Sequence, residues 1–162
     1  ENRSRLLLEV VRTVAQEIGA GRTGVRLSPM TTFGNSANRD SNPQALYGYV
    51  VEQLAPMGLA FLHVIEGETG ATRAPDGGRF DYDALRHKFP GAWMVNNCFT
   101  RDEALAAVQS GETDLVAFGR PFISTPDLVR RLKDDLPLNE LRADKLYGGG
   151  AEGYTDYPVL PE

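Results

Sequence analysis

Two loop segments combine residue types that could bind an anion. Asn97 and Cys98 would offer backbone amides just after a predicted strand. Gly119 would let the backbone approach a ligand closely, and the guanidinium of Arg120 can grip two phosphate oxygens. A turn followed by a surface arginine is an equally ordinary interpretation of Gly119 and Arg120. The residue types alone therefore predict a phosphate site and leave the simple turn open.

Arg26 is a further candidate, because it stands inside a predicted strand between Val25 and Leu27. A charge within a strand is costly to bury unless a partner neutralises it. If its side chain points into the mouth of a barrel of strands, it needs an anionic partner from a ligand or a carboxylate. In the alternative interpretation, Arg26 points outward and forms a salt bridge with a helix.

Few other side chains are reactive. His63 lies in the middle of a predicted strand and is expected to be a hydrogen-bonded core residue, whereas His87 is expected to be exposed on a polar helix. Cys98 is the only cysteine, which excludes an internal disulfide and a thiolate metal cluster. We expect it to be a small buried filler rather than a reactive thiol near a cofactor. No metal site is predicted, and a cytoplasmic location is the simplest expectation.

The composition is that of a globular protein. The chain has 162 residues, of which 41% are hydrophobic and 24% charged, so it can bury a real core. Its formal net charge of −5 disfavours a nucleic-acid partner, which rewards a broad basic surface. No apolar run approaches the roughly 20 residues that span a membrane, and no signal peptide opens the chain. We therefore predict no nucleic-acid and no membrane partner.

These residues must be positioned by short strands that alternate with helices. Strands are predicted at 23–28, 59–65, 93–95 and 115–118, and the second is apolar nearly throughout, as a strand buried on both faces should be. The apolar residues of the first helix repeat at helical spacing: Leu7, Val10, Val11, Val14 and Ile18.

The later helices carry signals at their amino ends. Asn42 is predicted to cap a helix with Pro43 at its first position. Thr100 and Glu103 have the spacing of a capping box, in which each side chain accepts a hydrogen bond from the other's backbone amide. Three side chains of that helix are expected to face inward, namely Ala104, Ala107 and Val108. A final helix is predicted from 125–127 to about residue 133.

This alternation predicts parallel strands joined by helical crossovers. Four strands are too few for a barrel, which takes eight, and the chain begins directly with a helix and without an initiator Met. We therefore expect α/β architecture in which residues 1–162, with a tail at 134–162, form the carboxyl-terminal half of a (β/α)8 TIM barrel cut from a longer product. In such barrels, the loops after strands seven and eight often bind phosphate.

Several motifs in register resemble the old yellow enzyme family: ENRSRLLLEVV (1–11), GVRLSP (24–29), AFGRPF (117–122), TPDL (125–128) and YGGGAEGYTDYP (147–158). The resemblance covers essentially the whole chain. It implies a TIM-barrel flavoprotein that binds FMN and uses NADPH or NADH to reduce activated C=C bonds of enones, and also nitro compounds.

The resemblance also implies roles for individual residues. Arg26 would lie by the flavin's pyrimidine edge, and Asn97, Cys98, Gly119 and Arg120 would hold the FMN phosphate. The family usually has glycine where Asn97 stands, and asparagine tolerates the positive φ that such a position requires. Two aromatic residues would line the substrate site, Tyr154 and Phe33. The glycine-rich loop 66–79 would border the substrate as a lid, with a passive surface loop as the alternative.

The family's catalytic residues fall outside this sequence. Its substrate-anchoring histidine, proton-donating tyrosine and flavin-tuning threonine all match positions before the segment seen here, so no catalytic residue is assigned in this chain. We expect the chain alone to be inactive and its partner to be the amino-terminal half of the same barrel. Two alternatives remain: a half-barrel that associates with itself as a homo-oligomer, and a flavin-free barrel enzyme acting on a phosphorylated sugar.

Overall fold

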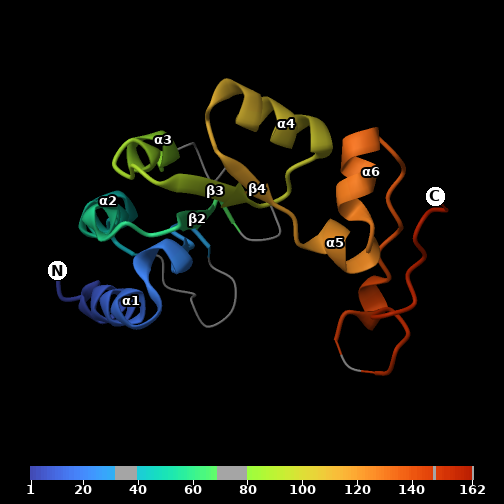
Figure 1. Ribbon diagram of the computed structural model, residues 1–162, viewed down its shortest axis with the longest axis horizontal. Coiled ribbons are helices and arrows are strands. Elements are labelled where there is room, and N and C mark those ends of the chain that lie inside the picture. The colour runs from blue at the N-terminus through green and yellow to red at the C-terminus, as the bar shows by residue number, and fades with distance from the viewer. Residues whose placement is uncertain (32–39, 69–79, 148, 162) are drawn as a thin grey trace. The chain divides into compact units, whose positions relative to one another are not determined.

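Four parallel strands form one sheet in the computed structural model, which describes residues 1–31, 40–68, 80–147 and 149–161. The strands pair in sequence order: β1 (Gly24–Leu27), β2 (Phe61–Ile65), β3 (Ala92–Asn96) and β4 (Leu115–Ala117). They belong to a compact unit, Glu1–Ala117, and the remaining residues form a second unit, Phe118–Glu162 (Figure 1). The predicted parallel α/β arrangement is confirmed.

Helices separate the strands as expected: α1 (Arg5–Ile18), α2 (Pro43–Leu54), α3 (Tyr82–Arg86) and α4 (Arg101–Ser110). β1 and β2 both begin later than predicted. Short 3-10 turns at Ala20–Arg22 and Ala55–Met57 take up the residues between helix and strand. The Thr23 backbone N donates to Ala20 O at 2.9 Å, so Thr23 ends the first turn before β1 starts.

The predicted starts of α2 and α4 are confirmed. The Asn42 side chain accepts a hydrogen bond from Ala45 N at 3.1 Å, with Pro43 at the first helical position. Thr100 N donates to Glu103 Oε2 at 2.8 Å, and the Thr100 hydroxyl accepts from Glu103 N at 3.3 Å. Both halves of the capping box are thus formed, and each satisfies a backbone amide that the first turn leaves without a partner.

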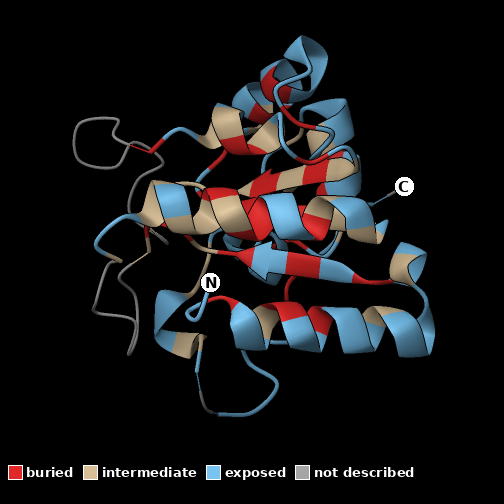
Figure 2. Ribbon diagram, turned by 90° about the vertical axis from the view of Figure 1, so that its left-hand side faces the viewer, coloured by how far each residue is buried: buried red, intermediate tan, exposed pale blue. Residues whose placement is uncertain are grey.

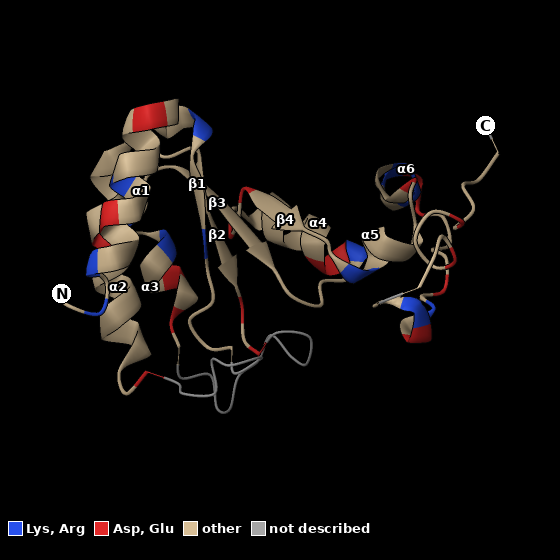
Figure 3. Cartoon of the chain, turned by 90° about the horizontal axis from the view of Figure 1, so that it is seen from below, with Lys and Arg blue, Asp and Glu red and all other residues tan. Residues whose placement is uncertain are grey.

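One face of the sheet packs under helices and holds the core. α1, α2 and α3 lie on one side of β1 and β2 (Figure 3). The strand side chains on this side are buried, as the red bands on the strands in Figure 2 show: Val25, Leu27, Leu62, Val64, Trp93 and Val95. Because successive strand residues point to opposite faces, the alternate residues form a second surface, which we call the open face.

Gly24 allows a close approach on the open face. A Cβ on Gly24 would lie 2.4 Å from the ring of Phe61, its register partner on β2. The ring of Phe61 therefore lies across the position of Gly24, and any larger residue there would push it aside.

One expectation about an inward-facing side chain is wrong. Val108 is 45% exposed, because Ala104 and Ala107 alone form the buried side of α4 and the next residue turns away by about a quarter of a helical turn. In α1, the buried residues are Leu8 and Val11. Four others form an exposed apolar row, which we call the α1 stripe: Leu6, Val10, Val14 and Ile18.

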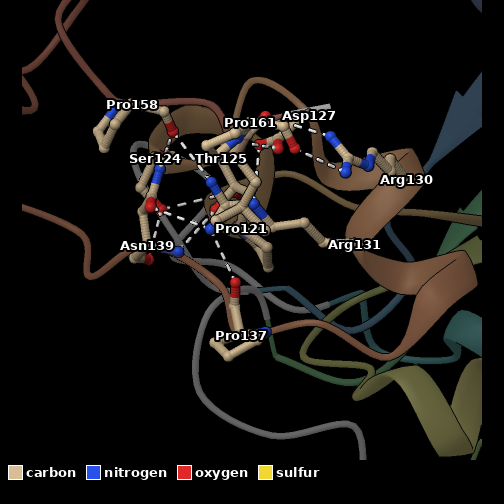
Figure 4. Close-up of polar contacts among 11 residues, drawn as sticks. Pro121, Ser124, Thr125, Asp127, Arg130, Arg131, Pro137, Asn139, Pro158 and Pro161 are labelled. Atoms are coloured by element: carbon tan, nitrogen blue, oxygen red, sulfur yellow. Dashed lines mark hydrogen bonds and ion pairs between the residues drawn. The ribbon is translucent and has the colours of Figure 1, made fainter.

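Arg131 organises the second unit, which contains α5 (Arg120–Ser124), α6 (Leu128–Asp134) and a 3-10 turn within the tail (Ala143–Lys145). Its side chain is only 3% exposed. The guanidinium donates to Asp127 Oδ1 (2.8 Å), Pro137 O (2.7 Å) and Pro158 O (3.0 Å), so it ties the tail to α6 (Figure 4). The predicted final helix is thus α6, and it starts later, at Leu128. No helix in the described residues is long and apolar enough to cross a membrane.

Candidate functional site

Arg26 lies on the open face of the sheet. It is the register partner of His63, which in turn pairs with Met94, so these three side chains occupy one row across β1, β2 and β3. Arg26 is exposed, between the buried Val25 and Leu27. Within the described part of the chain it makes no hydrogen bond or ion pair. The alternative in which Arg26 forms a salt bridge with a helix is therefore wrong for the residues that the structure describes.

His63 is half-buried next to this arginine. Its Nε2 lies 3.1 Å from Asn96 Oδ1, and since the amide oxygen can only accept, Nε2 carries the proton. Burial lowers the pKa of His63 below its usual value, and the positive charge of Arg26 lowers it further, while the hydrogen bond to Asn96 opposes both. The expectation that His63 is hydrogen-bonded is confirmed, and both burial and the charge of Arg26 favour the neutral imidazole.

Asn97 and Cys98 follow β3 with an unusual backbone. Their φ angles are 115° and 54°, in the left-handed region that favours glycine. The positive φ expected for Asn97 is confirmed. Its buried side chain does what glycine could not: Nδ2 donates to Glu66 O at 2.7 Å and to Glu68 O at 2.8 Å. Asn97 thus joins the loop after β3 to the loop after β2, a contact that sequence reasoning missed.

Cys98 is exposed, and the expectation of a buried filler is wrong. The reason is its backbone: with φ at 54°, its side chain turns away from the core, whereas its neighbours Asn97 and Phe99 are buried. Its Sγ lies 3.5 Å from Asn97 Oδ1.

Gly119 and Arg120 belong to the second unit, where they begin α5. Gly119 O accepts hydrogen bonds from Phe122 N (2.9 Å) and Ile123 N (3.2 Å). A Cβ added to Gly119 would meet no atom within 4 Å, so space beside its backbone is open. Arg120 is exposed. Because Asn97 and Cys98 lie in the first unit, a phosphate site shared by all four residues stays a prediction.

Of the two residues expected at the substrate site, the structure describes Tyr154 and not Phe33. Tyr154 is 55% exposed, and its hydroxyl donates to Leu146 O at 2.9 Å. Phe33 lies outside the described residues, as does most of the predicted lid, at 69–79. His87 is exposed, as expected, and pairs with Asp83 one helical turn earlier. In the described ranges, no group of three or more His, Cys, Asp or Glu residues is arranged to hold a metal ion.

Comparison with known proteins identifies the family. The sequence profile of the NADH:flavin oxidoreductase / NADH oxidase family matches residues 1–139. The chain belongs to this family. It is 40% identical over 161 residues to 12-oxophytodienoate reductase 2 of Arabidopsis thaliana, an alignment that covers 99% of this chain and 42% of the relative. A Leishmania infantum protein named "Probable flavin mononucleotide-dependent alkene reductase" is 38% identical, with the same coverage of both chains.

Solved structures of family members agree with these sequence matches. The old yellow enzyme from Trypanosoma cruzi superposes with a TM-score of 0.87 at 33% identity, over 98% of this chain and 41% of its own. Morphinone reductase gives a TM-score of 0.87 at 38% identity, over 99% of this chain and 42% of its own. The resemblance to old yellow enzymes is confirmed. The chain spans less than half the length of these relatives.

Proposed function

We propose that this chain is the carboxyl-terminal half of an FMN-dependent (β/α)8-barrel oxidoreductase that reduces activated C=C bonds, and that it is a poor catalyst alone. When bound, FMN supplies hydride transfer from NADPH or NADH to the alkene. The family match supports the flavin. It also disfavours a barrel that acts on a phosphorylated sugar without flavin. A cytoplasmic location remains part of the prediction.

The observation that carries the proposal is the position of Arg26. A cation on the open face, without an anionic partner in the described residues, fits a ligand that becomes negatively charged. In the family, the matching arginine lies at the flavin's pyrimidine edge, where a fixed positive charge stabilises the anionic reduced ring. We assign Arg26 this role.

The phosphate contacts are assigned to two segments. Asn97 and Cys98 supply backbone amides, and their consecutive left-handed conformations fit a loop that turns its N–H groups toward an anion. Gly119 supplies a backbone with open space beside it, and Arg120 a guanidinium. Tyr154 and Phe33 are assigned to the substrate wall.

Reconstitution tests the proposal. The chain is co-expressed with the amino-terminal part of morphinone reductase that it does not match, and the purified material is assayed for bound FMN and for NADH- or NADPH-dependent loss of cyclohexenone. We expect a yellow, active complex, and the chain alone should reduce cyclohexenone at a small fraction of that rate. Colourless material in every mixture, or full activity of the chain alone, contradicts the proposal.

A matched pair of variants localises the phosphate contact in that complex. Arg120→Ala removes a charge-assisted hydrogen bond worth roughly 1.5–3 kcal/mol, so the Kd for FMN should rise about tenfold or more. Arg130→Ala is the control, because Arg130 is an exposed arginine of the same unit whose contacts are to Leu160 O and Pro161 O. Equal losses in both variants would show that Arg120 has no special role.

A second candidate function, association with another copy of the chain, is favoured by the α1 stripe. Its four side chains are between 38% and 73% exposed, and adjacent apolar side chains of this size usually have a partner.

A further inference from the structure

Arg26, His63 and Asn96 lie on three adjacent strands of the open face, in the order β1, β2, β3. Arg26 and His63 are register partners, and Asn96 is two residues beyond Met94, the partner of His63. Side chains at these positions share one face, and neighbouring strands lie about 4.8 Å apart. His63 thus stands between a guanidinium on one side and an amide on the other.

The hydrogen bond to Asn96 determines which way the imidazole is held. Nε2–H donates to Asn96 Oδ1 at 3.1 Å, so the ring is tied to β3, on the side away from Arg26. An amide oxygen carries no charge and can be satisfied by a neutral histidine, whereas a carboxylate in its place would hold the imidazolium. The residue type at position 96 therefore affects whether His63 is neutral or positively charged beside Arg26.

The surroundings of His63 add no second charge. Met94 and Asn96, its neighbours from β3, are uncharged, and Arg26 from β1 is the one charged side chain that acts on it in the described residues. Glu66, the acid that follows β2, acts on Tyr82 instead. Within strands β1 to β4, Arg26 is the one permanently charged residue.

We propose that His63 and Asn96 are positioning residues for Arg26: they hold a neutral imidazole tied to β3, so that Arg26 alone offers a positive charge to the ligand on this face. The inference deepens the proposed function, because the ligand it concerns is the anionic ring of reduced flavin. A second positive charge beside Arg26 would repel the guanidinium, displace it from its place in the row and make ligand binding depend on pH.

NMR titration of the two histidine rings in the 162-residue chain tests the proposal without any flavin. Since the chain has two histidines, His87 on α3 serves as the internal reference signal. We expect the His63 ring to remain the Nε2–H tautomer and to titrate below its usual pKa of 6.5. An Nδ1–H tautomer, or a ring already protonated at neutral pH, overturns the proposal.

Three substitutions should change the pH at which the His63 ring is half protonated, and not all in the same direction. Arg26→Gln removes the neighbouring charge and should raise it, Asn96→Ala removes the acceptor and should lower it, and Asn96→Asp supplies a carboxylate and should raise it above that of the native chain. The His87 signal should not move in any of them. Unchanged midpoints in Arg26→Gln and Asn96→Asp refute the coupling between His63 and its two neighbours.

Folding of each variant is checked by circular dichroism and by an unchanged His87 signal, and the tautomer and titration of His63 in the native chain decide the proposal if a variant fails to fold. A flavin measurement in the reconstituted complex then tests the functional consequence. Between pH 6 and 8, the Kd for reduced FMN should vary more with pH in Asn96→Asp than in the native complex. If no complex binds FMN, the proposed function fails while the histidine titrations still decide the positioning role.

Discussion

At the scale of single residues, the side chains of Asn97 and His63 connect loops and strands that are far apart in the sequence. Asn97 adopts a backbone conformation suited to glycine and at the same time donates two hydrogen bonds to the loop after β2. His63 is held by Asn96 and stays neutral beside Arg26. Each contact joins residues about thirty positions apart, so it depends on strand register rather than on local sequence.

The lowered pKa of His63 predicts how stability changes with pH. In the unfolded chain this histidine binds a proton near pH 6.5, but in the folded chain it binds one only at lower pH. Between the two values the unfolded state holds more protons, so the free energy of unfolding should be highest above about pH 6.5 and should fall as the pH decreases toward the folded pKa. Urea denaturation at a series of pH values measures this.

The matched variants for this prediction are His63→Gln and His87→Gln. His63→Gln should make the free energy of unfolding nearly independent of pH between pH 6.5 and the region where carboxylates titrate. His87→Gln should leave the pH dependence of the native chain in place. A native chain whose stability is constant over that window, or rises on acidification, would show that His63 is not shifted in this direction.

At the scale of helices and strands, local signals explain where elements begin and what holds them. The capping box of α4 is complete, and α6 is held to the tail through Arg131. α4 buries only two alanines, so its stability depends strongly on its first turn.

Thr100→Ala should therefore destabilise the first unit by about 1 kcal/mol, the typical value of an N-cap. The control is Thr13→Ala, which removes an exposed threonine from the middle of α1 and should change the unfolding free energy little, since alanine is the better helix former. Chemical denaturation followed by circular dichroism gives both values. Equal effects of the two substitutions would mean that the cap contributes nothing.

Arg131→Lys should loosen the second unit. Lysine keeps the positive charge beside Asp127 but cannot make the diverging contacts to Pro137 O and Pro158 O as well, so the tail loses hydrogen bonds that hold it to α6. Limited proteolysis followed by mass spectrometry should detect cleavage in 137–161 much earlier than in the native chain. Arg130→Lys, which alters an exposed arginine next to it, should be cut no faster than native, and rapid cleavage of both would refute the special role of Arg131.

At the scale of the whole molecule, the first unit has surfaces that favour association with another protein chain. The α1 stripe is apolar and exposed, and the open face presents the exposed side chain of Arg26. β1 lies at one edge of the sheet, and an unpaired strand edge offers free backbone hydrogen-bonding groups.

We expect the purified chain to self-associate in the absence of a complementary half. Size-exclusion chromatography with light scattering should give a mass at least twice that of one chain, and the mass should fall on dilution. Val10→Lys with Val14→Lys should shift the equilibrium toward monomer by placing charges in the α1 stripe. Thr13→Lys with Gln16→Lys adds the same charge at exposed polar positions of α1 and should not. A native chain that is monomeric at high concentration contradicts the expectation.

The sequence by itself determined the features that depend on neighbours a few residues apart. Helical periodicity, the caps at Asn42 and Thr100 and the alternation that implies parallel strands all follow from short-range geometry. The motifs in register identified the family, and that resemblance implied the positive φ of Asn97. Tertiary structure alone decided what depends on distant parts of the chain. The pairing of strands placed Arg26 beside His63 and His63 within reach of Asn96, and the packing of α4 left Val108 exposed against expectation. Burial and hydrogen bonding across strands are set by register and packing, which no local pattern contains.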